Sequence, residues 1–413
     1  MSAEIRRGRI FLIMTMALFT AAASVALRAV IAAHLRADFL DALDPGCASE
    51  LLGTILGTAF AGFSITLFVA SPLLPVLTMR RALMAAGLLL AGGLALMALA
   101  GAGGTGVFAV LALAMLLQGI GWGLVEAVIN PLTSALYDAD KTHRLNVLHA
   151  WYPGGIVAGS LIGLAADGAG LDWRWAALPV ALLALGVFAL ALTERFPARE
   201  TIGNGVSMGE MIRAVARQPT IFLWFLVMTM TATTEFAPGQ WVDFALSEIV
   251  GMRGILLLVY VSALMFVMRH FAGPLVRRLS NVGLLFVCSI FAAGGLYGLS
   301  LAATPAGALL AATAWGVGIC FCWPTMLATV AERYPQGGTL VYGLMGSAGA
   351  AATYLTLPVL GRVYDQAGGS AAPAAAASAS FQAVALIPAA LILVFGLILL
   401  ADQRRARQAA ARA

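Results

Sequence analysis

Charged residues are scarce in this chain. They make up 10% of its 413 residues, whereas hydrophobic residues make up 61%; a soluble domain usually carries about 25% charged residues. A globule of this size cannot bury so much apolar surface away from water. The scarcity of charge therefore excludes a soluble protein and predicts one whose solvent is lipid.

Cysteine is also rare, with four copies at Cys47, Cys288, Cys320 and Cys322. Only Cys47 falls in a candidate loop, so no disulfide framework is expected. The other three lie in apolar runs, and Cys320 and Cys322 have no histidine or acidic neighbour that would indicate a metal site. The sequence also lacks a nucleotide-binding loop and a nucleophile elbow. We therefore expect no enzyme, no ATP-driven pump, and no metal or other cofactor.

What the sequence does contain is a series of long apolar runs. The first run, which follows three arginines, is too long for the apolar region of a signal peptide and is expected to be a membrane helix. Each run can cross about 30 Å of hydrocarbon as a helix. The sequence therefore predicts an all-α membrane protein with twelve transmembrane helices. The twelve predicted spans are 9–33, 50–76, 82–101, 105–136, 145–166, 174–194, 220–246, 254–275, 282–302, 305–330, 339–363 and 380–401.

The basic residues predict the orientation of these spans. The net charge of +5 does not indicate a nucleic-acid partner, because basic residues cluster beside apolar runs, as in membrane proteins. With a cytoplasmic N-terminus, most of the 24 lysines and arginines fall on the cytoplasmic side. The positive-inside rule thus predicts a multi-pass protein of the inner (plasma) membrane with both termini in the cytoplasm. These cytoplasmic residues are Arg6, Arg7, Arg9, Arg80, Arg81, Lys141, Arg144, Arg195, Arg199, Arg213, Arg217, Arg277, Arg278, Arg333, Arg404, Arg405, Arg407 and Arg412.

A polar segment divides the chain into two similar halves. We expect a six-helix half over 1–194, a cytoplasmic loop over 195–218, and a second six-helix half with a basic tail over 219–413. Ser71-Pro72 before paired arginines is echoed by Gly273-Pro274 before another pair. Two parallel halves around a central site are typical of secondary transporters.

Glycine spacing predicts close packing between some of these helices. Gly119 and Gly123 are four residues apart, and Gly155, Gly159 and Gly163 form a stripe along one helix face. Such small residues let helix backbones approach each other in lipid.

Several motifs resemble one transporter family. The fourth span reads Gly-Ile-Gly-Trp-Gly-Leu-Val-Glu-Ala-Val-Ile-Asn-Pro (119–131), and Arg144-Leu145-Asn146 opens the fifth. Further matches are Glu248-Ile249-x-Gly251-Met252, Pro324-Thr325, and the segment 358–368. Over essentially its whole length the chain is similar to the fucose-permease-like branch of the major facilitator superfamily, the sugar:proton symporters.

The resemblance implies alternating-access transport of a monosaccharide-like solute. It implies that Glu126 lies near the substrate, together with Asn130 of the same element. His149 and Tyr152 match positions at which the sugar permeases carry amides. The sequence departs from the family at Arg28, which stands where those permeases have an acidic residue tied to proton coupling.

Charged residues inside spans are also informative by themselves, because each costs about 2.5–3.5 kcal/mol at a helix centre and needs a partner or a wet cavity. Glu126, a lone carboxyl in an apolar setting, can bind and release a proton, or it can be a neutral group bonded to a neighbouring helix. Arg28 can neutralise Glu126 or hold an anionic substrate. Arg269 and His270 are expected to brace helices or to reach the membrane surface.

The seventh and fifth spans supply further candidates. Pro238 and Gly239 are expected to kink or interrupt the seventh span, which would place Glu235, Gln240 and Trp241 at the site. Trp241 can instead be an anchor at the membrane surface. His149 can be a ligand, a proton relay or a packed residue. Trp122 and Trp323 either face the central cavity or pack in the core.

These observations predict a secondary transporter rather than an enzyme. We expect a small-molecule substrate, most simply a monosaccharide coupled to protons, in a monomer embedded in the bilayer. An organic or sugar acid held by Arg28, sodium coupling, and export remain alternatives. A non-transporting membrane sensor on the same fold is disfavoured by the many charges within the spans.

Overall fold

The computed structural model describes residues 6–100, 106–137, 141–197, 208–246 and 253–410, and all of its regular elements in these ranges are helices. The predicted motif 248–252 lies outside the described residues, as do the residues between the third and fourth predicted spans and part of the loop 195–218.

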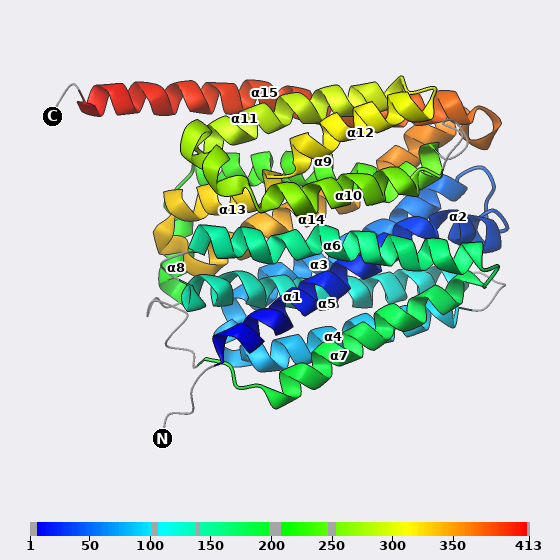
Figure 1. Cartoon of the computed structure of the whole chain (residues 1–413), viewed down its shortest axis with the longest axis horizontal. Helices are drawn as coiled ribbons and strands as arrows, with labels where there is room; N and C mark the ends of the chain where they lie inside the picture. Colours follow the sequence, from blue (N-terminus) through cyan, green and yellow to red (C-terminus); the bar gives the residue numbers. More distant parts are fainter. Residues whose placement is uncertain (1–5, 101–105, 138–140, 198–207, 247–252, 411–413) are drawn as a thin grey trace.

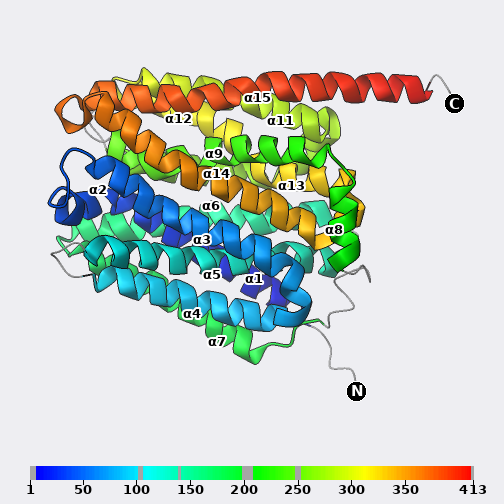
Figure 2. The same ribbon diagram turned by 180° about the vertical axis from the view of Figure 1, so that it is seen from behind.

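Long helices α1 to α7 form one half of the molecule, and α9 to α15 form the other; the two halves lie side by side in both views (Figures 1 and 2). The first half contains α1 (Arg7–Val30), α2 (Ala32–Leu35), α3 (Ala48–Leu77), α4 (Met79–Ala98), α5 (Gly106–Leu136), α6 (Lys141–Gly168) and α7 (Ala177–Thr193). A π-helical turn, η1 (Arg36–Leu40), and a 3-10 turn, η3 (Trp173–Ala176), join some of them.

The connecting loop contains α8 (Met208–Ala216), a short helix at one end of the bundle (Figure 1). The second half follows with α9 (Ile221–Leu246), α10 (Ile255–Arg269), α11 (Ala272–Ser300), α12 (Pro305–Ile319), α13 (Cys322–Arg333), α14 (Gly338–Gln366) and α15 (Pro373–Ala410), with 3-10 turns η5 (Pro335–Gly337) and η6 (Gly369–Ala371).

The prediction of twelve spans is confirmed. Within the described residues, eleven helical stretches are long and apolar enough to cross a membrane. The shorter apolar helix α10 and the beginning of α11 make up the remaining span. Both chain termini lie at the same end of the bundle, as an even number of crossings requires (Figure 1). We call this end the terminal end and the opposite one the far end.

Two turns at corresponding places support the predicted similarity of the halves. Thr78, between α3 and α4, and Ser280, within α11, are the two non-glycine residues with positive φ among the described residues, at 60° and 63°. Each side-chain oxygen accepts a hydrogen bond from the N–H three residues later, at 3.4 Å from Arg81 and 3.2 Å from Gly283. Thr78 and Ser280 are separated by the same distance in sequence as Pro72 and Pro274, so both halves turn in the same way.

The glycine pattern packs helices as predicted. A Cβ at Gly119 would lie 1.9 Å from the carbonyl oxygen of Ala59 on α3. Cβ atoms at Gly155 and Gly159 would each lie 2.2 Å from a carbonyl oxygen of α1, those of Phe19 and Ala23. No side chain fits at these positions, so α5 meets α3, and α6 meets α1, backbone to backbone.

The seventh span was expected to be kinked or interrupted at Pro238 and Gly239, and the structure contradicts the interruption. Helix α9 runs from Ile221 to Leu246 with Pro238 inside it; a single proline removes one hydrogen bond, which a packed membrane helix tolerates. The spans that break are the eighth, at His270 and Phe271, and the tenth, at Cys320 and Phe321.

Candidate functional site

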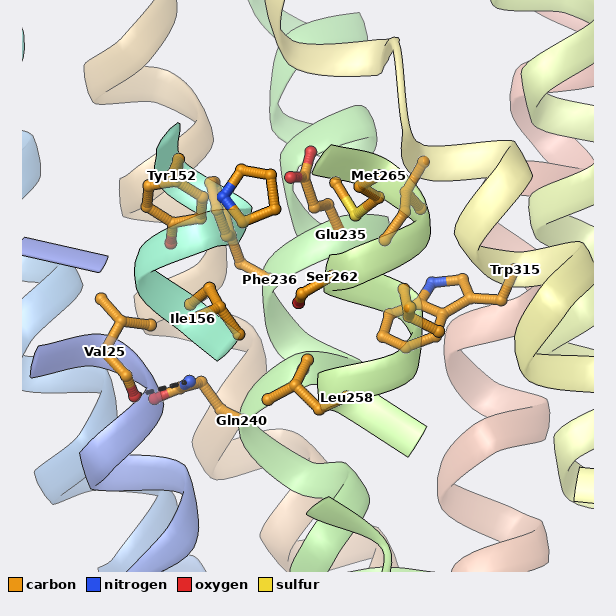
Figure 3. A pocket seen from close by; sticks show the side chains of 14 residues that line it. Val25, Tyr152, Ile156, Glu235, Phe236, Gln240, Leu258, Ser262, Met265 and Trp315 are labelled. Carbon is orange, nitrogen blue, oxygen red and sulfur yellow. Dashed lines mark hydrogen bonds between the residues drawn. The ribbon is translucent and has the colours of Figure 1, made fainter. Parts of the chain in front are cut away.

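Two adjoining cavities lie at the centre of the bundle, where the halves meet. The first is lined by α1, α6, α9, α10 and α12 and contains Glu235 and Gln240 among its polar groups (Figure 3). The second adds α5 and α13. Tyr152, Glu235 and Phe236 line both cavities, so the two cavities are treated together as the candidate site. The second cavity is lined by Trp122, Glu126, His149, Tyr152, Glu235, Phe236, Arg269 and Trp323.

Glu126 begins a chain of hydrogen bonds in the first half. Glu126 and Asn130 lie one turn apart on α5, which places their side chains together. The Asn130 amide donates to Oε2 of Glu126 at 2.9 Å, and the Asn130 oxygen lies 2.8 Å from Nε2 of His149. Because that amide oxygen can only accept, Nε2 of His149 carries the proton. All three residues are buried.

Arg269 of α10 contributes a buried cation to the site from the second half. Its guanidinium is 2% exposed and donates from Nη1 to the carbonyl oxygen of His149 and from Nε to that of Cys320, each at 2.8 Å. Both carbonyls stand four residues before a proline, Pro153 and Pro324 respectively. A proline has no N–H to complete the helical bond. Arg269 therefore supplies the two donors that these prolines remove.

Glu235 is the acidic partner of Arg269. Its Oε1 lies 3.5 Å from Nη2 of Arg269, and both groups are almost fully buried. Its other oxygen, Oε2, has no hydrogen-bond partner among the described residues. A buried carboxylate oxygen without a partner loses its hydration with no compensation, so Glu235 retains capacity for one more donor.

Arg28 is the second buried cation, and it does not pair with Glu126. It is 1% exposed, and its Nε and Nη1 have no hydrogen-bond partner in the described part of the chain. The titratable group with which it interacts electrostatically is Tyr152, whose hydroxyl is also without a partner there. The charged residue that acts electrostatically on Glu126 is Arg269 and not Arg28.

Aromatic rings from both halves surround these polar groups. Trp122 stacks on Tyr152 with ring centroids 5.7 Å apart and meets Phe236 edge-on at 5.8 Å. Phe236 and Trp323, which both belong to the second half, meet with ring centroids 5.4 Å apart. Trp241 is fully buried against Tyr364 and does not line either cavity. Its burial also excludes the alternative of an exposed anchor at the membrane surface.

The structure thus brings together eight of the ten residues proposed from sequence. Seven of them line a cavity: Trp122, Glu126, His149, Tyr152, Glu235, Gln240 and Trp323. Asn130 bonds to two of these. Arg28 and Trp241 do not line either cavity. The sequence analysis did not propose Phe236 or Trp315 for the site, because nothing distinguishes an apolar cavity residue from a core residue in an apolar run.

Comparison with known proteins identifies the architecture. The family model described as Major Facilitator Superfamily matches residues 9–357. No curated protein matches the sequence. The solved structure of the xylose transporter XylE from E. coli, in a partially occluded inward-open conformation, is similar with a TM-score of 0.73 and 14% identity, covering 94% of this chain and 98% of that one.

Two other solved structures are similar over nearly their whole length. The E. coli fucose:proton symporter FucP has a TM-score of 0.63 at 15% identity, with 92% of this chain and 98% of that chain covered. The human organic anion transporter MFSD10 has a TM-score of 0.62 at 16% identity, with 94% and 100% covered. At these identities the likeness shows a shared fold.

Proposed function

The chain belongs to the major facilitator superfamily and is a transporter, not an enzyme, and we propose that it moves a small hydroxylated solute of monosaccharide size by alternating access, coupled to protons. The observation that carries this proposal is the central site. Glu126 and Tyr152 come from one half, Glu235 and Arg269 from the other, and all four line one cavity. A site divided in this way changes its access when the halves rock against each other.

The composition of the site fits a sugar-like solute. The rings of Trp122, Tyr152, Phe236 and Trp323 offer apolar faces of the kind on which a sugar ring stacks. Between them stand polar atoms without partners in the described residues, on Tyr152, Glu235 and Gln240. A solute with several hydroxyl groups supplies both donors and acceptors to such atoms. The fucose-permease-like motifs support the same substrate size.

Glu126 is the proposed proton carrier. It has no ion-pair partner within the described residues, and burial favours its neutral form. Its bond to Asn130 links it to His149 and, through the backbone carbonyl of His149, to Arg269 of the other half. Movement of the halves therefore changes the surroundings of the carboxyl, which is what coupling requires. Sodium coupling is the competing possibility.

The remaining features complete the proposal. The excess of arginines at the terminal end supports a cytoplasmic location of this end and a location of the protein in the inner membrane. The protein acts as a monomer, since each half supplies the other's partner surface. Ion pairs between the halves at the far end, Arg362 with Glu50 and Arg253 with Asp167, close the site from outside.

Uptake into proteoliposomes tests this function. Purified protein is reconstituted, and the accumulation of a panel of labelled monosaccharides, polyols and sugar acids is measured under an imposed proton gradient. We expect uphill accumulation of at least one compound, abolished when a protonophore collapses the gradient. Accumulation driven by a sodium gradient alone would show that the coupling ion is sodium and not the proton. No accumulation, exchange or efflux for any compound would reject the proposal.

A second candidate substrate class, an organic or sugar acid, is favoured by one observation, the buried Arg28 without a partner.

A further inference from the structure

Arg28 is an unusual feature in a membrane-spanning helix. Its side chain is 1% exposed, and two of its three guanidinium nitrogens are buried without a hydrogen-bond partner in the described residues. No carboxylate of the described residues forms an ion pair with it, although Arg269 has Glu235. A buried, unpaired charge is strongly unfavourable in protein and in lipid. A buried guanidinium of this kind is therefore expected where a ligand supplies the missing hydrogen-bond acceptors.

The position of Arg28 connects it to the cavity. Val25, three residues earlier on α1, lines the first cavity, and residues three apart share a helix face. Helical side chains lean towards the N-terminus of their helix, which favours an Arg28 side chain directed back towards Val25. Tyr152, the titratable group that acts electrostatically on Arg28, lines both cavities, in agreement with this direction. Arg28 itself does not line either cavity in this structure.

Both donors and acceptors without partners in the described part of the chain surround the first cavity. The Tyr152 hydroxyl and the Gln240 side chain lie towards Val25, and the Glu235 carboxyl lies at the end opposite Gln240 (Figure 3). Arg28 and the Tyr152 hydroxyl are donors without acceptors. Oε2 of Glu235 is an acceptor without a donor, and Oε1 of Gln240 is another. The Gln240 amide itself donates weakly to the carbonyl oxygen of Val25, at 3.4 Å.

We propose that the site binds a small polyhydroxy monocarboxylate, with its carboxylate on Arg28 and Tyr152 and its hydroxyl groups on Gln240 and Glu235. The inference rests on the proposed function of this cavity as the transport site. A guanidinium matches a carboxylate with two parallel hydrogen bonds. The hydroxyl groups of the ligand donate hydrogen bonds to Oε2 of Glu235 and Oε1 of Gln240, the two acceptors that have no donor among the described residues.

The charges of the site favour one negative charge on the substrate. Arg28 and Arg269 contribute two positive charges, and Glu235 compensates that of Arg269 across 3.5 Å. One positive charge on Arg28 remains when Glu126 is neutral. A monocarboxylate balances it, whereas a phosphate ester would bring nearly two negative charges into a site with one free cation.

Ligand-induced stabilisation of the detergent-purified full-length protein tests the inference, because a ligand that binds the folded state raises the melting temperature by mass action. The probes are D-gluconate, D-glucose and D-glucose 6-phosphate, which carry one, no and nearly two negative charges at neutral pH. We expect gluconate to raise the melting temperature of the wild type more than either of the others. Equal or greater stabilisation by glucose, or no response to gluconate, would overturn the inference.

Variants assign the effect to Arg28. In Arg28→Gln we expect gluconate to bind roughly 10- to 150-fold more weakly, the loss of a charged hydrogen-bonding partner, while Arg28→Lys retains part of the affinity. Arg174→Gln, an arginine of η3 with its own partner Asp172, is the control and should bind as the wild type does. Unchanged gluconate binding in Arg28→Gln would also overturn the inference.

The binding and uptake experiments distinguish a failure of the proposed anion site from a failure of the proposed transport function. If glucose binds and is accumulated while gluconate is not, the transport function stands and the anion site falls. If gluconate stabilises the wild type and no compound is transported in either direction, the anion site stands and the transport function falls. Should Arg28→Gln not fold, the comparison of the three probes in the wild type decides the inference alone.

Discussion

Arg269 of α10 donates a hydrogen bond from Nη1 to the backbone carbonyl of His149 on α6, at 2.8 Å. This bond crosses between the halves of the molecule and uses a carbonyl that Pro153 leaves without its helical donor. A second bond of the same guanidinium serves the carbonyl of Cys320 at the break between α12 and α13. One side chain thus ties the break in one half to a proline in the other, beside the candidate site.

Replacing Arg269 should therefore destabilise the protein strongly. Arg269→Gln removes the cation opposite Glu235 and at least one of the donors to the two carbonyls. Breaking a buried pair in this way costs about 3–5 kcal/mol of unfolding free energy. A fall in the apparent melting temperature in detergent reports it.

Arg333→Gln is the matched control for that measurement. Arg333 pairs with Asp402, but both side chains are about one third exposed, at 30% and 32%. Exposed pairs contribute about 1 kcal/mol or less. A melting temperature for Arg269→Gln that falls no further than that of Arg333→Gln would contradict the bracing role.

The glycine contacts give a second prediction. In Gly159→Ala the new methyl group would lie 2.2 Å from the carbonyl oxygen of Ala23, so α6 must move away from α1. We expect a lower melting temperature, although alanine is the better helix former by about 1 kcal/mol. Gly186→Ala in α7 meets nothing within 4 Å and should leave the melting temperature unchanged or raise it. Equal behaviour of the two variants would refute the packing argument.

The far end of the bundle is held closed by ion pairs between the halves. Arg362 of α14 contacts Glu50 of α3 at 2.6 Å, and Arg253, just before α10, contacts Asp167 of α6 at 2.5 Å. Asp365 adds a bond to the backbone N–H of Glu50, at 3.2 Å. Opening of the site towards the far end must break these contacts.

Weakening these pairs should shift the protein towards the state open at the far end. In a background without the native cysteines, Ser262→Cys places a thiol on the cavity wall. We expect a membrane-impermeant thiol reagent added from outside to label it faster when Glu50→Gln and Arg253→Gln are also present. Asp172→Asn, which breaks an exposed pair with Arg174 inside one half, should not change the rate. Equal labelling in all three proteins would exclude a gate at this end.

Much of the fold follows from patterns that the sequence shows directly. Long apolar runs specify spans, and the glycine stripe of Gly155, Gly159 and Gly163 specifies close packing, because both depend only on local composition and period. The break of the tenth span at Cys320 was not predicted, whereas a break near Pro238 was. Whether a proline interrupts a helix depends on what neighbours supply to the freed carbonyl, and the supplier at Cys320 is Arg269 from another helix.

The site was predicted less completely, for a similar reason. Buried charges such as Glu126 and Glu235 stand out in apolar runs, because lipid makes them costly. For Trp241, the sequence does not distinguish a residue that lines the cavity from one that packs in the core, and the structure places its ring against Tyr364. Whether Arg28 pairs with Glu126 also depends on the depths of two helices in the membrane, which the sequence gives only coarsely. In the structure Arg28 forms no ion pair with Glu126, and the titratable group that acts on it is Tyr152.

The central claim, a proton-coupled transport site built around Glu126, is tested most directly by Glu126→Gln in proteoliposomes. The measurement compares uphill accumulation under a proton gradient with exchange of labelled for unlabelled substrate at equilibrium, using the compound found by the uptake panel and Glu332→Gln, an exposed acidic residue, as control. We expect Glu126→Gln to lose accumulation but to retain exchange. The glutamine oxygen can still accept the hydrogen bond from Asn130, but the side chain cannot release a proton. Undiminished accumulation in Glu126→Gln would contradict the central claim.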